Sequence, residues 1–492
     1  MKDRYVLAVD QSTQGTKAIL FDSQGNVTCR CDVPHKQYIN EKGWVSHNLE
    51  EIYQNTLQAV RDVVEKSGIA KEQILCLGIS NQRETSAIWN RETGEPLTKA
   101  VVWQCSRAKE VCERVKAQGK AEEIRQRTGM HLSPYFPASK YAWLRENTPG
   151  ADKLMHDGKL CFGTIDTWLL FRLTHGKVFA TDYSNASRTQ LYNIYRFKWD
   201  EDICQWFGID KKGLPQICDS SYQYGETDFE GFLQKPIPIL GVIGDSQGAL
   251  FGQGCIEKGM VKATYGTGSS VMMNIGEKPV LSEKGLVTSL AWGIDGKVSY
   301  VLEGNINYTG AVITWLIQDL KLVESPGETQ ELAFAANKLD TTYLVPAFSG
   351  LGAPYWKPDA KATISGMSRK TGKCEIVKAA LESIAYQITD VIEMMKAENG
   401  SGVKELCVDG GPTGNRYLMG FQSDILGIPV TLSRCEESSA QGAAYMAGIK
   451  AGFYDKRMIF AGEKRSQYLP SMTEEEREEK YFGWKHAVGK VI

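Results

Sequence analysis

The sequence predicts an α/β protein built from two related halves. At 492 residues, the chain exceeds what one hydrophobic core usually supports. Strand-like apolar runs and helix-like patterns alternate along it, which is typical of the α/β class. A hairpin pattern at residues 9–22 (VDQSTQGTKAILFD) returns in outline at residues 261–275 (VKATYGTGSSVMMNI). We therefore expect two domains, residues 1–252 and 253–492.

The opening hairpin has an unusually long polar turn. Apolar runs at residues 5–9 and 18–21 are bounded by turn residues, so both are predicted strands. A tight hairpin needs two or three turn residues. Here, Asp10 and Lys17 flank the series Ser12, Thr13, Gln14, Gly15 and Thr16. Hydroxyls, a glycine, a carboxylate and a lysine suit a phosphate and its metal ion, although this segment alone is equally compatible with a solvated loop.

Further elements follow the same alternation. Predicted strands lie at residues 74–79, 86–89, 100–103 and 405–409, an ordered unit begins at residue 163, and predicted helices span residues 416–426 and 474–488. Residues 410–414 (GGPTG) are predicted to form a loop between a strand and a helix.

Composition excludes several classes of protein. The net charge is −2 and there is no long basic run, which argues against nucleic-acid and membrane-surface partners. No apolar stretch is long enough to span a bilayer, and the first residues do not resemble a secretion signal. The twelve cysteines form no CxxC pair, and the six histidines show no metal-ligand spacing. We expect buried free thiols in a cytoplasmic protein.

Three turns rich in Gly, Thr and Ser follow predicted strands, at residues 10–17, 266–270 and 410–415. Backbone N–H groups in such turns form concavities that bind anions. Two common phosphate signatures fail: residues 366–374 have the wrong glycine spacing for a P-loop, and residues 266–268 lack the third glycine of a dinucleotide fingerprint. Three turns distributed over both halves indicate a split nucleotide site.

Several polar and aromatic residues suit a polyhydroxy ligand. Arg83 and Glu84 can donate to and accept from neighbouring hydroxyls, although a surface turn with a loose ion pair would give the same pattern. Asp245 lies before a predicted helix, where it could be an ordinary N-cap or a base that accepts a hydroxyl proton. Trp103 and Tyr135 could provide an apolar wall for sugar carbons.

Longer motifs resemble a known family. Residues 135–144 (YFPASKYAWL) and residues 362–382, which include ATISGM, EI and AALE, resemble the two signatures of the FGGY carbohydrate kinases. Within that family, the pattern is most similar to that of its glycerol kinases. That similarity runs nearly end to end through SNQRET (80–85), VVWQCSRA (101–108), TDYSNASRT (181–189), FSGLGAPYW (348–356) and FQSDILG (421–427).

The resemblance implies two actin-like (ribonuclease H-like) domains, each a central mixed sheet flanked by helices, with the active site in the cleft between them. It implies an ATP-dependent kinase that uses Mg²⁺ and phosphorylates a primary hydroxyl of a small polyol. The implied polyol pocket and first phosphate loop lie in the first domain, and nucleotide binding lies in the second. The implied site residues are Asp10 for the metal; Thr13, Lys17, Thr267, Gly310, Gly411 and Asn415 for the nucleotide; and Arg83, Glu84, Trp103, Tyr135 and Asp245 for the polyol, with Asp245 as general base.

Five positions depart from the glycerol kinase pattern: Ser12, Lys17, Ser246, Ser270 and Thr314. Ser246 and Ser270 replace a larger Gln and Phe, which enlarges the expected polyol pocket and makes it more polar. Glycerol is the first expected substrate, and a larger polyol or ketose is the alternative. An actin-like ATPase without an acceptor substrate is a third hypothesis, which the polyol residues argue against. The oligomeric state is left open, and a homo-oligomer is compatible with the sequence.

Overall fold

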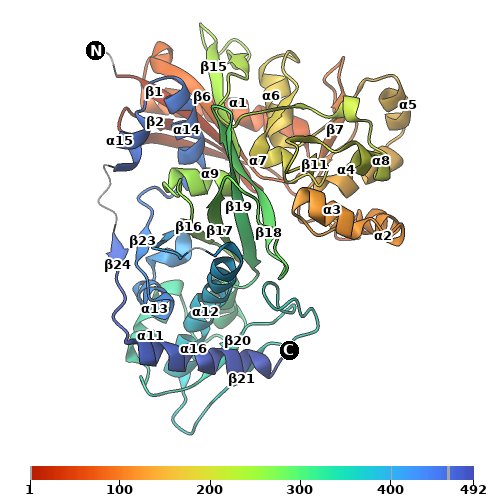
Figure 1. The fold of residues 1–492 in the computed structure, drawn as a ribbon. Coiled ribbons are helices and arrows are strands. Elements are labelled where there is room, and N and C mark those ends of the chain that lie inside the picture. Colours follow the sequence, from red (N-terminus) through yellow and green to blue (C-terminus); the bar gives the residue numbers. More distant parts are fainter. Residues whose placement is uncertain (1–2, 401, 462–465) are drawn as a thin grey trace.

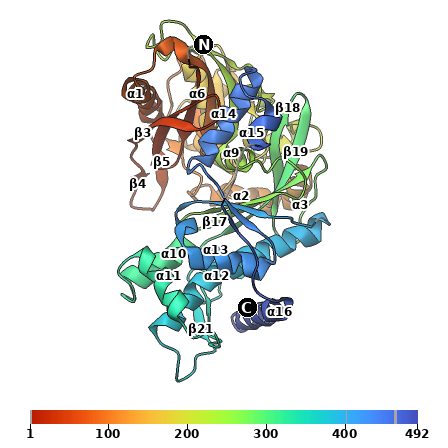
Figure 2. The same cartoon turned by 90° about the vertical axis from the view of Figure 1, so that its left-hand side faces the viewer.

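The computed structural model describes residues 3–400, 402–461 and 466–492. The chain forms two lobes, each built on a mixed β-sheet, and the lobes lie one above the other in two perpendicular views (Figures 1 and 2). The N-terminal elements lie in the upper lobe, and the closing helix α16 (Glu474–Gly489) lies at the bottom. The predicted α/β class with two halves is confirmed.

The sheet of the upper lobe has six strands in the order β14, β15, β6, β1, β2, β3. Their bounds are β14 Gly225–Thr227, β15 Ile237–Gly244, β6 Ile74–Asn81, β1 Tyr5–Gln11, β2 Gly15–Phe21 and β3 Val27–Pro34. The β1–β2 pair is antiparallel and the β1–β6 pair is parallel, so the predicted opening hairpin is confirmed within a mixed sheet.

Both faces of this sheet are buried, which explains the unbroken apolar run of β1. Leu7 and Val9 pack in one core cluster with residues of α1 (Leu49–Ser67). Val6 and Ala8 point to the opposite face and pack with residues of α14 (Ser438–Lys450). Successive side chains of a strand point to opposite faces, so a strand that is covered on both sides is apolar throughout.

The sheet of the lower lobe has seven strands in the order β18, β19, β17, β16, β22, β23, β24. Their bounds are β18 Val287–Ile294, β19 Lys297–Ile306, β17 Ser269–Gly276, β16 Val261–Tyr265, β22 Leu406–Asp409, β23 Val430–Leu432 and β24 Gln467–Tyr468. From β19 to β24, the strand order and directions repeat those of the upper sheet from β3 to β14. The similarity between the two predicted hairpins thus reflects five strands with the same order and directions in both sheets. The edge strands differ, because β14 precedes β15 in the chain whereas β24 follows β23, and β18 has no counterpart in the upper sheet.

Smaller elements complete each lobe. The upper lobe also holds β4 (Tyr38–Ile39), β5 (Val45–His47), β7 (Ala87–Asn90), β8 (Ala100–Val101), α2 (Lys109–Ala117), α3 (Ala121–Thr128), α4 (Pro137–Asn147), α5 (Ala151–His156), β9 (Leu160–Gly163), α6 (Ile165–Leu173), β10 (Ala180–Asp182), α7 (Tyr183–Ala186), β11 (Tyr192–Asn193), β12 (Lys198–Trp199), α8 (Glu201–Trp206), β13 (Gln216–Cys218) and α9 (Asp245–Gly252). The remaining elements are α10 (Gly310–Gln318), α11 (Pro326–Ala335), β20 (Tyr343–Val345), β21 (Thr363–Ser365), α12 (Lys373–Asn399), α13 (Arg416–Leu426) and α15 (Lys456–Ala461).

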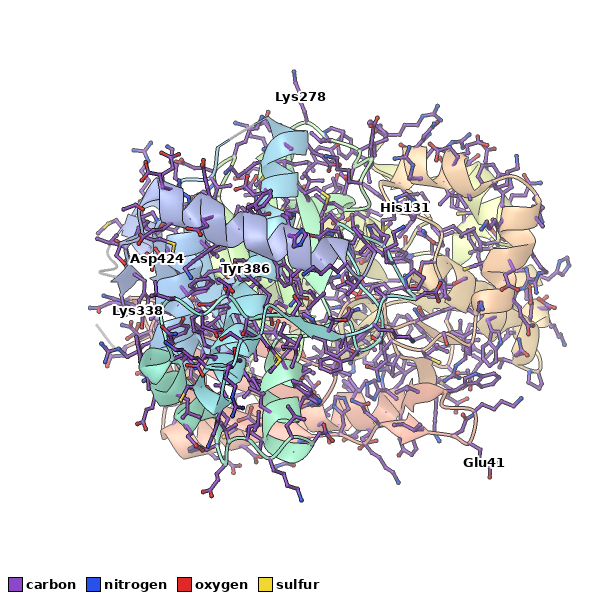
Figure 3. All side chains as sticks on the ribbon, turned by 90° about the horizontal axis from the view of Figure 1, so that it is seen from below. Glu41, His131, Lys278, Lys338, Tyr386 and Asp424 are labelled. Carbon is purple, nitrogen blue, oxygen red and sulfur yellow. The ribbon has the colours of Figure 1, made fainter. Side chains whose placement is uncertain are left out.

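The predicted closing helix is confirmed as α16, which packs on the long helix α12. Trp484 stacks on Tyr386 with ring centroids 5.2 Å apart, and its indole N–H donates to Asp390 at 2.8 Å. Figure 3 shows this end of the molecule from below and labels Tyr386. The helix therefore closes the lower lobe over a buried aromatic and carboxylate cluster.

One helix of the later sequence packs on the upper sheet. Helix α14 lies against β6, β15 and α9 although its residues belong to the predicted second domain. A Cβ atom at Gly78 would meet the Ala443 carbonyl oxygen at 2.3 Å, and one at Gly442 would meet the Gly248 carbonyl oxygen at 1.9 Å. Only glycine fits at these two positions. The absence of side chains there lets α14 pack closely on the first lobe.

Three local predictions differ from the structure. The predicted strand at 100–103 ends at Val101, although the Val102 amide still donates to the Val45 carbonyl of β5 at 3.3 Å. The predicted loop at 410–414 contains a 3₁₀ turn at Gly411–Gly414. Asp245 is the first residue of α9 and the N-cap is Gly244, so the reading of Asp245 as an N-cap is wrong.

The absence of disulfides agrees with the prediction. No disulfide joins any of the twelve cysteines, which all lie in the described ranges, and eight of them are buried. Within the described ranges, no helix combines the length and the apolar character that crossing a membrane requires.

Candidate active site

A deep cleft of about 1310 Å³ lies between the two lobes. Eight of the predicted site residues line it: Thr13, Lys17, Arg83, Glu84, Trp103, Tyr135, Asp245 and Thr267. Asp10, Gly310, Gly411 and Asn415 are not among the lining residues. The cleft has two parts, described below as the turn end (the turns at residues 10–17 and 266–270) and the charged end (Arg83, Glu84, Arg188, Asp245 and Glu303).

The first turn is held in shape by its own hydrogen bonds. The Ser12 amide and hydroxyl both donate to the Gly15 carbonyl, at 2.9 and 3.0 Å. From outside the turn, a ring nitrogen of His35 lies 3.0 Å from the Thr13 carbonyl, and the His35 amide donates to Gln14 at 3.1 Å. Burial lowers the pKa of His35, so its ring is neutral at physiological pH and supports the turn without adding charge. The backbone is thus fixed before any ligand enters.

The second turn is fixed by helix α10. The Gly310 amide donates to the Gly266 carbonyl at 2.9 Å, and the Ala311 amide donates to the Thr267 carbonyl at 3.0 Å. A Cβ atom at Gly310 would meet the Gly266 oxygen at 2.8 Å. Gly310 therefore lies against the second turn, and its amide already donates to a carbonyl of that turn.

The third turn lies against the base of the second. Gly410 has φ of +99°, and a Cβ atom there would meet the Tyr265 carbonyl oxygen at 2.0 Å. Gly411 has open space beside it. Asn415 caps α13 by accepting from the Leu418 amide at 3.0 Å, and it donates to Thr329 at 3.0 Å. The two predicted nucleotide residues of this turn thus adjoin the second turn, outside the lining of the cleft.

Asp10 has the properties of a ligand for a cation. It lies at the end of β1, opposite Lys17 in the hairpin, and it is buried. Burial raises the pKa of Asp10 to about 6, which means that its charge lacks sufficient compensation. Mg²⁺ commonly takes one or two carboxylates together with phosphate oxygens and water. A single under-compensated carboxylate beside a phosphate-type turn fits that pattern, and no larger group of metal-ligating residues is present in the described part of the chain.

Lys17 is already engaged by a carboxylate. Its Nζ lies 2.7 Å from Glu437, which immediately precedes α14, and Arg30 pairs with the same carboxylate. Both cations line the cleft. A phosphate at the first turn would therefore compete with Glu437 for the Lys17 ammonium.

The charged end is a buried network that joins the two lobes. Arg83 donates from two nitrogens to Glu303 of β19, at 2.8 and 3.0 Å, and Arg188 donates to Glu303 at 2.8 Å. Arg188 also donates to Glu84 at 2.5 Å. Arg83 is only 6% exposed and Glu303 is fully buried. Interpreting residues 81–85 as a surface turn is therefore wrong: this segment is buried and highly connected.

Two carboxylates of this network have unusual properties: Glu84 in its backbone conformation and Glu303 in its pKa. Glu84 has φ of +60°, an uncommon left-handed conformation for a residue with a side chain, of the kind that clusters at functional sites. Although burial alone would raise the pKa of Glu303, Arg188 and Arg83 hold it well below its usual range. Glu303 is therefore ionised at any pH near neutrality.

Asp245 is the accessible carboxylate of the charged end. Its side chain is 38% exposed, and Oδ1 lies 3.2 Å from Arg83 Nε. The Ser246 amide donates to the same oxygen at 2.6 Å. Both contacts use Oδ1, and Oδ2 forms no hydrogen bond or ion pair within the described residues. A carboxylate that is held on one oxygen and open on the other can accept a proton from a bound hydroxyl.

The aromatic wall connects the two ends of the cleft. The rings of Trp103 and Tyr135 lie 5.6 Å apart between their centroids, at an angle of 59°. The Trp103 indole N–H donates to the Thr13 hydroxyl at 2.9 Å. The wall predicted for sugar carbons is thus hydrogen-bonded to the first turn.

Three charged residues at the site are absent from the sequence predictions: Lys262, which lines the cleft, and Arg188 and Glu303, which are buried behind its lining in the network with Arg83 and Glu84. Glu303 and Lys262 each interrupt an apolar strand, in YVLEGNI and VKATY, and a charge inside such a strand is a signal that could have identified them. Arg188 lies in the segment SNASRT, which carries the family resemblance, but no local pattern indicated its role.

Comparisons with known proteins agree with this geometry. Residues 5–252 match the N-terminal domain of the FGGY family of carbohydrate kinases, and residues 261–451 match its C-terminal domain. Glycerol kinase 1 of Thermotoga maritima is 49% identical over 490 residues, which cover 99% of each chain. The glycerol kinase of Bacillus subtilis is 43% identical over 488 residues, 99% of this chain and 98% of its own.

Solved structures point the same way. A crystal structure of Plasmodium falciparum glycerol kinase with ADP has a TM-score of 0.94 at 34% identity, covering 100% of this chain and 98% of its own. A xylulose kinase from Lactobacillus acidophilus shares the fold, with a TM-score of 0.88 at 21% identity, covering 99% of this chain and 97% of its own. The predicted pair of actin-like domains is confirmed. The chain belongs to the FGGY family of carbohydrate kinases.

Proposed function

We propose that this chain transfers the γ-phosphoryl group of ATP to a terminal hydroxyl of glycerol, giving ADP and glycerol 3-phosphate. The observation that carries the proposal is that the half-exposed carboxylate of Asp245 contacts Arg83 and lines one cleft together with Glu84 and the turn residues Thr13 and Thr267. Full-length relatives that are glycerol kinases, at 43–49% identity, support the choice of acceptor.

Each lining residue has a physical task in this reaction. Arg83 and Glu84 donate to and accept from the glycerol hydroxyls, and the Trp103–Tyr135 wall packs against its carbon chain. Asp245 accepts the proton of the hydroxyl that attacks the γ-phosphorus. The amides of the two turns hold the phosphate oxygens, and closure of the lobes aligns donor and acceptor and excludes water.

Mg²⁺ bound with ATP would supply positive charge that offsets the negative charge developing on the phosphate oxygens. Asp10 is the residue that would hold it, because its carboxylate is buried and under-compensated. Cytoplasmic location is the expected compartment, since none of the twelve cysteines, all in the described ranges, forms a disulfide. An actin-like ATPase without an acceptor has no use for the Arg83–Glu84–Trp103 constellation, and the family assignment argues against it.

A coupled assay of ADP release tests the proposal. The purified protein is given ATP, Mg²⁺ and, in separate reactions, glycerol, four- and five-carbon polyols, ketoses or no acceptor. We expect strong dependence on the acceptor and a phosphorylated product with glycerol. ADP release that is equal with and without every acceptor would contradict a polyol kinase.

A larger polyol or ketose is the second candidate substrate, and two lining residues favour it. Ser246 and Ser270 are small and polar, and both line the same cleft as Asp245. Ser270 Oγ lies 3.4 Å from Glu303. They leave room and hydroxyl partners that a three-carbon polyol would not use, so the acceptor series above also distinguishes these two candidates.

A further inference from the structure

Lys262 is a buried cation in the cleft for which the proposed mechanism has no task. It lies on β16, two residues before Thr264 and four before the turn at Gly266. Lys262 is only 1% exposed, yet it lines the cleft together with Thr264, Thr267 and Asp245. Alternate residues of a strand share a face, so Lys262 and Thr264 both point to the same side of the lower sheet.

The hydrogen bonding of Lys262 is incomplete. Its Nζ donates to the Thr264 hydroxyl at 3.0 Å, and within the described residues it forms no salt bridge. An ammonium has three donors, and a buried charge with a single neutral partner is unfavourable. Asp409, Glu303 and Asp245 act on it only from longer range.

The two other buried lysines of the described chain behave differently. Lys378 forms an ion pair with Glu382 at 3.3 Å on α12, and Lys140 donates to the Tyr135 carbonyl within the upper lobe. Neither lines the cleft. Of the three buried lysines in the described residues, Lys262 alone lines the cleft and has ammonium hydrogens without an acceptor. An anion that enters the cleft can accept hydrogen bonds from them.

Charge balance at the site supports the same reading. Arg83 and Arg188 are matched by Glu84 and Glu303, which are all buried. Lys262 and the more exposed Asp245 are the charges that remain on this part of the cleft wall. A phosphoryl group that arrives between Asp245 and the second turn would therefore meet a cation that no carboxylate of the described residues contacts directly.

We propose that the Lys262 ammonium contacts the phosphoryl group during its transfer, as a catalytic residue of the reaction proposed above. In that step the acceptor oxygen bonds to the γ-phosphorus, the bond from phosphorus to the β–γ bridging oxygen breaks, and the acceptor proton passes to Asp245. Negative charge spreads over the three equatorial oxygens and the leaving oxygen. A preoriented ammonium in a cleft with little water stabilises that charge more than it stabilises ground-state ATP.

The test compares Lys262→Met with the matched control Lys378→Met, which removes a buried lysine far from the cleft. Three quantities are measured for each: kcat with glycerol or the best acceptor, the Kd of ADP, and the Kd of ADP with aluminium fluoride and the acceptor, which mimics the phosphoryl group in transfer. Removing one preoriented donor to a developing anion typically lowers kcat by about 10²–10³-fold. We expect this loss for Lys262→Met, a similar loss of affinity for the aluminium fluoride complex, and a nearly unchanged Kd of ADP. Lys378→Met is expected to lower the melting temperature but to keep kcat.

A folded Lys262→Met variant with the wild-type kcat would overturn the proposal. Equal losses of affinity for ADP alone and for the aluminium fluoride complex would also overturn it, because a structural role predicts that result. If Lys262→Met does not fold, Lys262→Gln can keep the hydrogen bond to Thr264 without the charge, and the same outcomes apply. A wild-type protein that phosphorylates no acceptor would instead contradict the proposed function.

Discussion

At the charged end of the cleft the chemistry is carried by side chains, whereas at the turn end it is carried by the backbone. Arg83, Arg188, Glu84 and Glu303 are locked together by hydrogen bonds of 2.5–3.0 Å. The turns at residues 10–17 and 266–270 instead present amides that are shaped by hydrogen bonds to their carbonyls. The charged end is thus built to distinguish one polar ligand from another, and the turn end to hold any phosphate of the right shape.

The difference follows from what each ligand offers. Hydroxyl groups are neutral and must be recognised one by one, which requires fixed donors and acceptors. Phosphate oxygens are equivalent and charged, so a concave set of amides suffices. Substitutions at the charged end should therefore change acceptor specificity or the chemical step, while substitutions at the turn end should change nucleotide use.

The largest effect is expected at Asp245. Loss of a general base typically lowers the rate by about 10²–10⁴-fold. Asp245→Asn keeps the size of the side chain and can keep the contact with the Ser246 amide. We expect that loss in kcat with an unchanged Kd of ADP, measured on protein whose melting temperature matches the wild type. Near-normal turnover of this variant would remove Asp245 from the mechanism.

The next effect concerns stability. Glu303→Gln leaves Arg83 and Arg188 facing a neutral amide, and breaking a buried ion pair typically costs about 3–5 kcal/mol. We expect a loss of this order in the free energy of unfolding, together with a higher KM for the acceptor because Arg83 loses its anchor. Glu382→Gln, which breaks the buried pair with Lys378, is the matched control: stability should fall while the acceptor KM stays.

The pH dependence of this loss has a definite sign. Arg188 and Arg83 lower the pKa of Glu303, although burial opposes them, so its contribution is complete at neutral pH. It is lost as the pH falls below about 4.3, the ordinary value for a glutamate, because the unfolded state then takes up the proton first. The stability difference between the wild type and Glu303→Gln should therefore shrink in acid. A constant difference across that range would contradict an ionised Glu303.

A smaller effect is expected from the turn threonines. A hydrogen bond to a charged group is worth about 1.5–3 kcal/mol, which corresponds to roughly tenfold to a hundredfold in kcat/KM. Thr267→Val should change kcat/KM for ATP alone. Thr13→Val should also raise the acceptor KM, because the Trp103 indole loses its hydrogen-bond partner. If both turns grip phosphates in one closed state, the double variant will not lose the sum of the two activation free energies. Strictly additive losses of activation free energy would show that the two turns act independently, which contradicts a shared closed state.

The two ends also differ in how far the sequence predicts them. The turn end is local: strand, turn and strand are adjacent in the chain, and turn chemistry alone predicts both hairpins. The charged end depends on contacts such as Arg83 to Glu303, which are 220 residues apart, and no local pattern indicates such a pair. The same holds for α14, whose packing on the upper sheet depends on close approach at Gly78 and Gly442. The roles assigned to Gly310, Gly411 and Asn415 came from the family resemblance alone and stay predictions.

The smallest and most selective effect concerns the size of the acceptor. Ser246 and Ser270 line the same cleft as Asp245. Fully burying a Phe side chain is worth roughly 1.5–3 kcal/mol, so its absence lowers the preference for glycerol by about tenfold to a hundredfold. The second candidate substrate therefore predicts that a four- or five-carbon polyol or ketose exceeds glycerol in kcat/KM, whereas the proposed function predicts that glycerol exceeds them. The double variant Ser270→Phe with Ser246→Gln should shift the preference back towards glycerol by about the same factor.

Side-by-side kinetics on the wild type and the double variant decide this point. Met272 and Tyr308 are the neighbours that could close the space, but Met272 is fully buried in the core cluster under α14. The Tyr308 hydroxyl donates to Ser349 at 2.7 Å and lies outside the cleft lining. Neither is therefore placed to replace the missing Phe, and the space beside Ser270 should stay open to an additional hydroxymethyl group. If glycerol exceeds every longer acceptor in the wild type, the closed state of the lobes must remove that space, and specificity at the charged end is then set by closure rather than by these two serines.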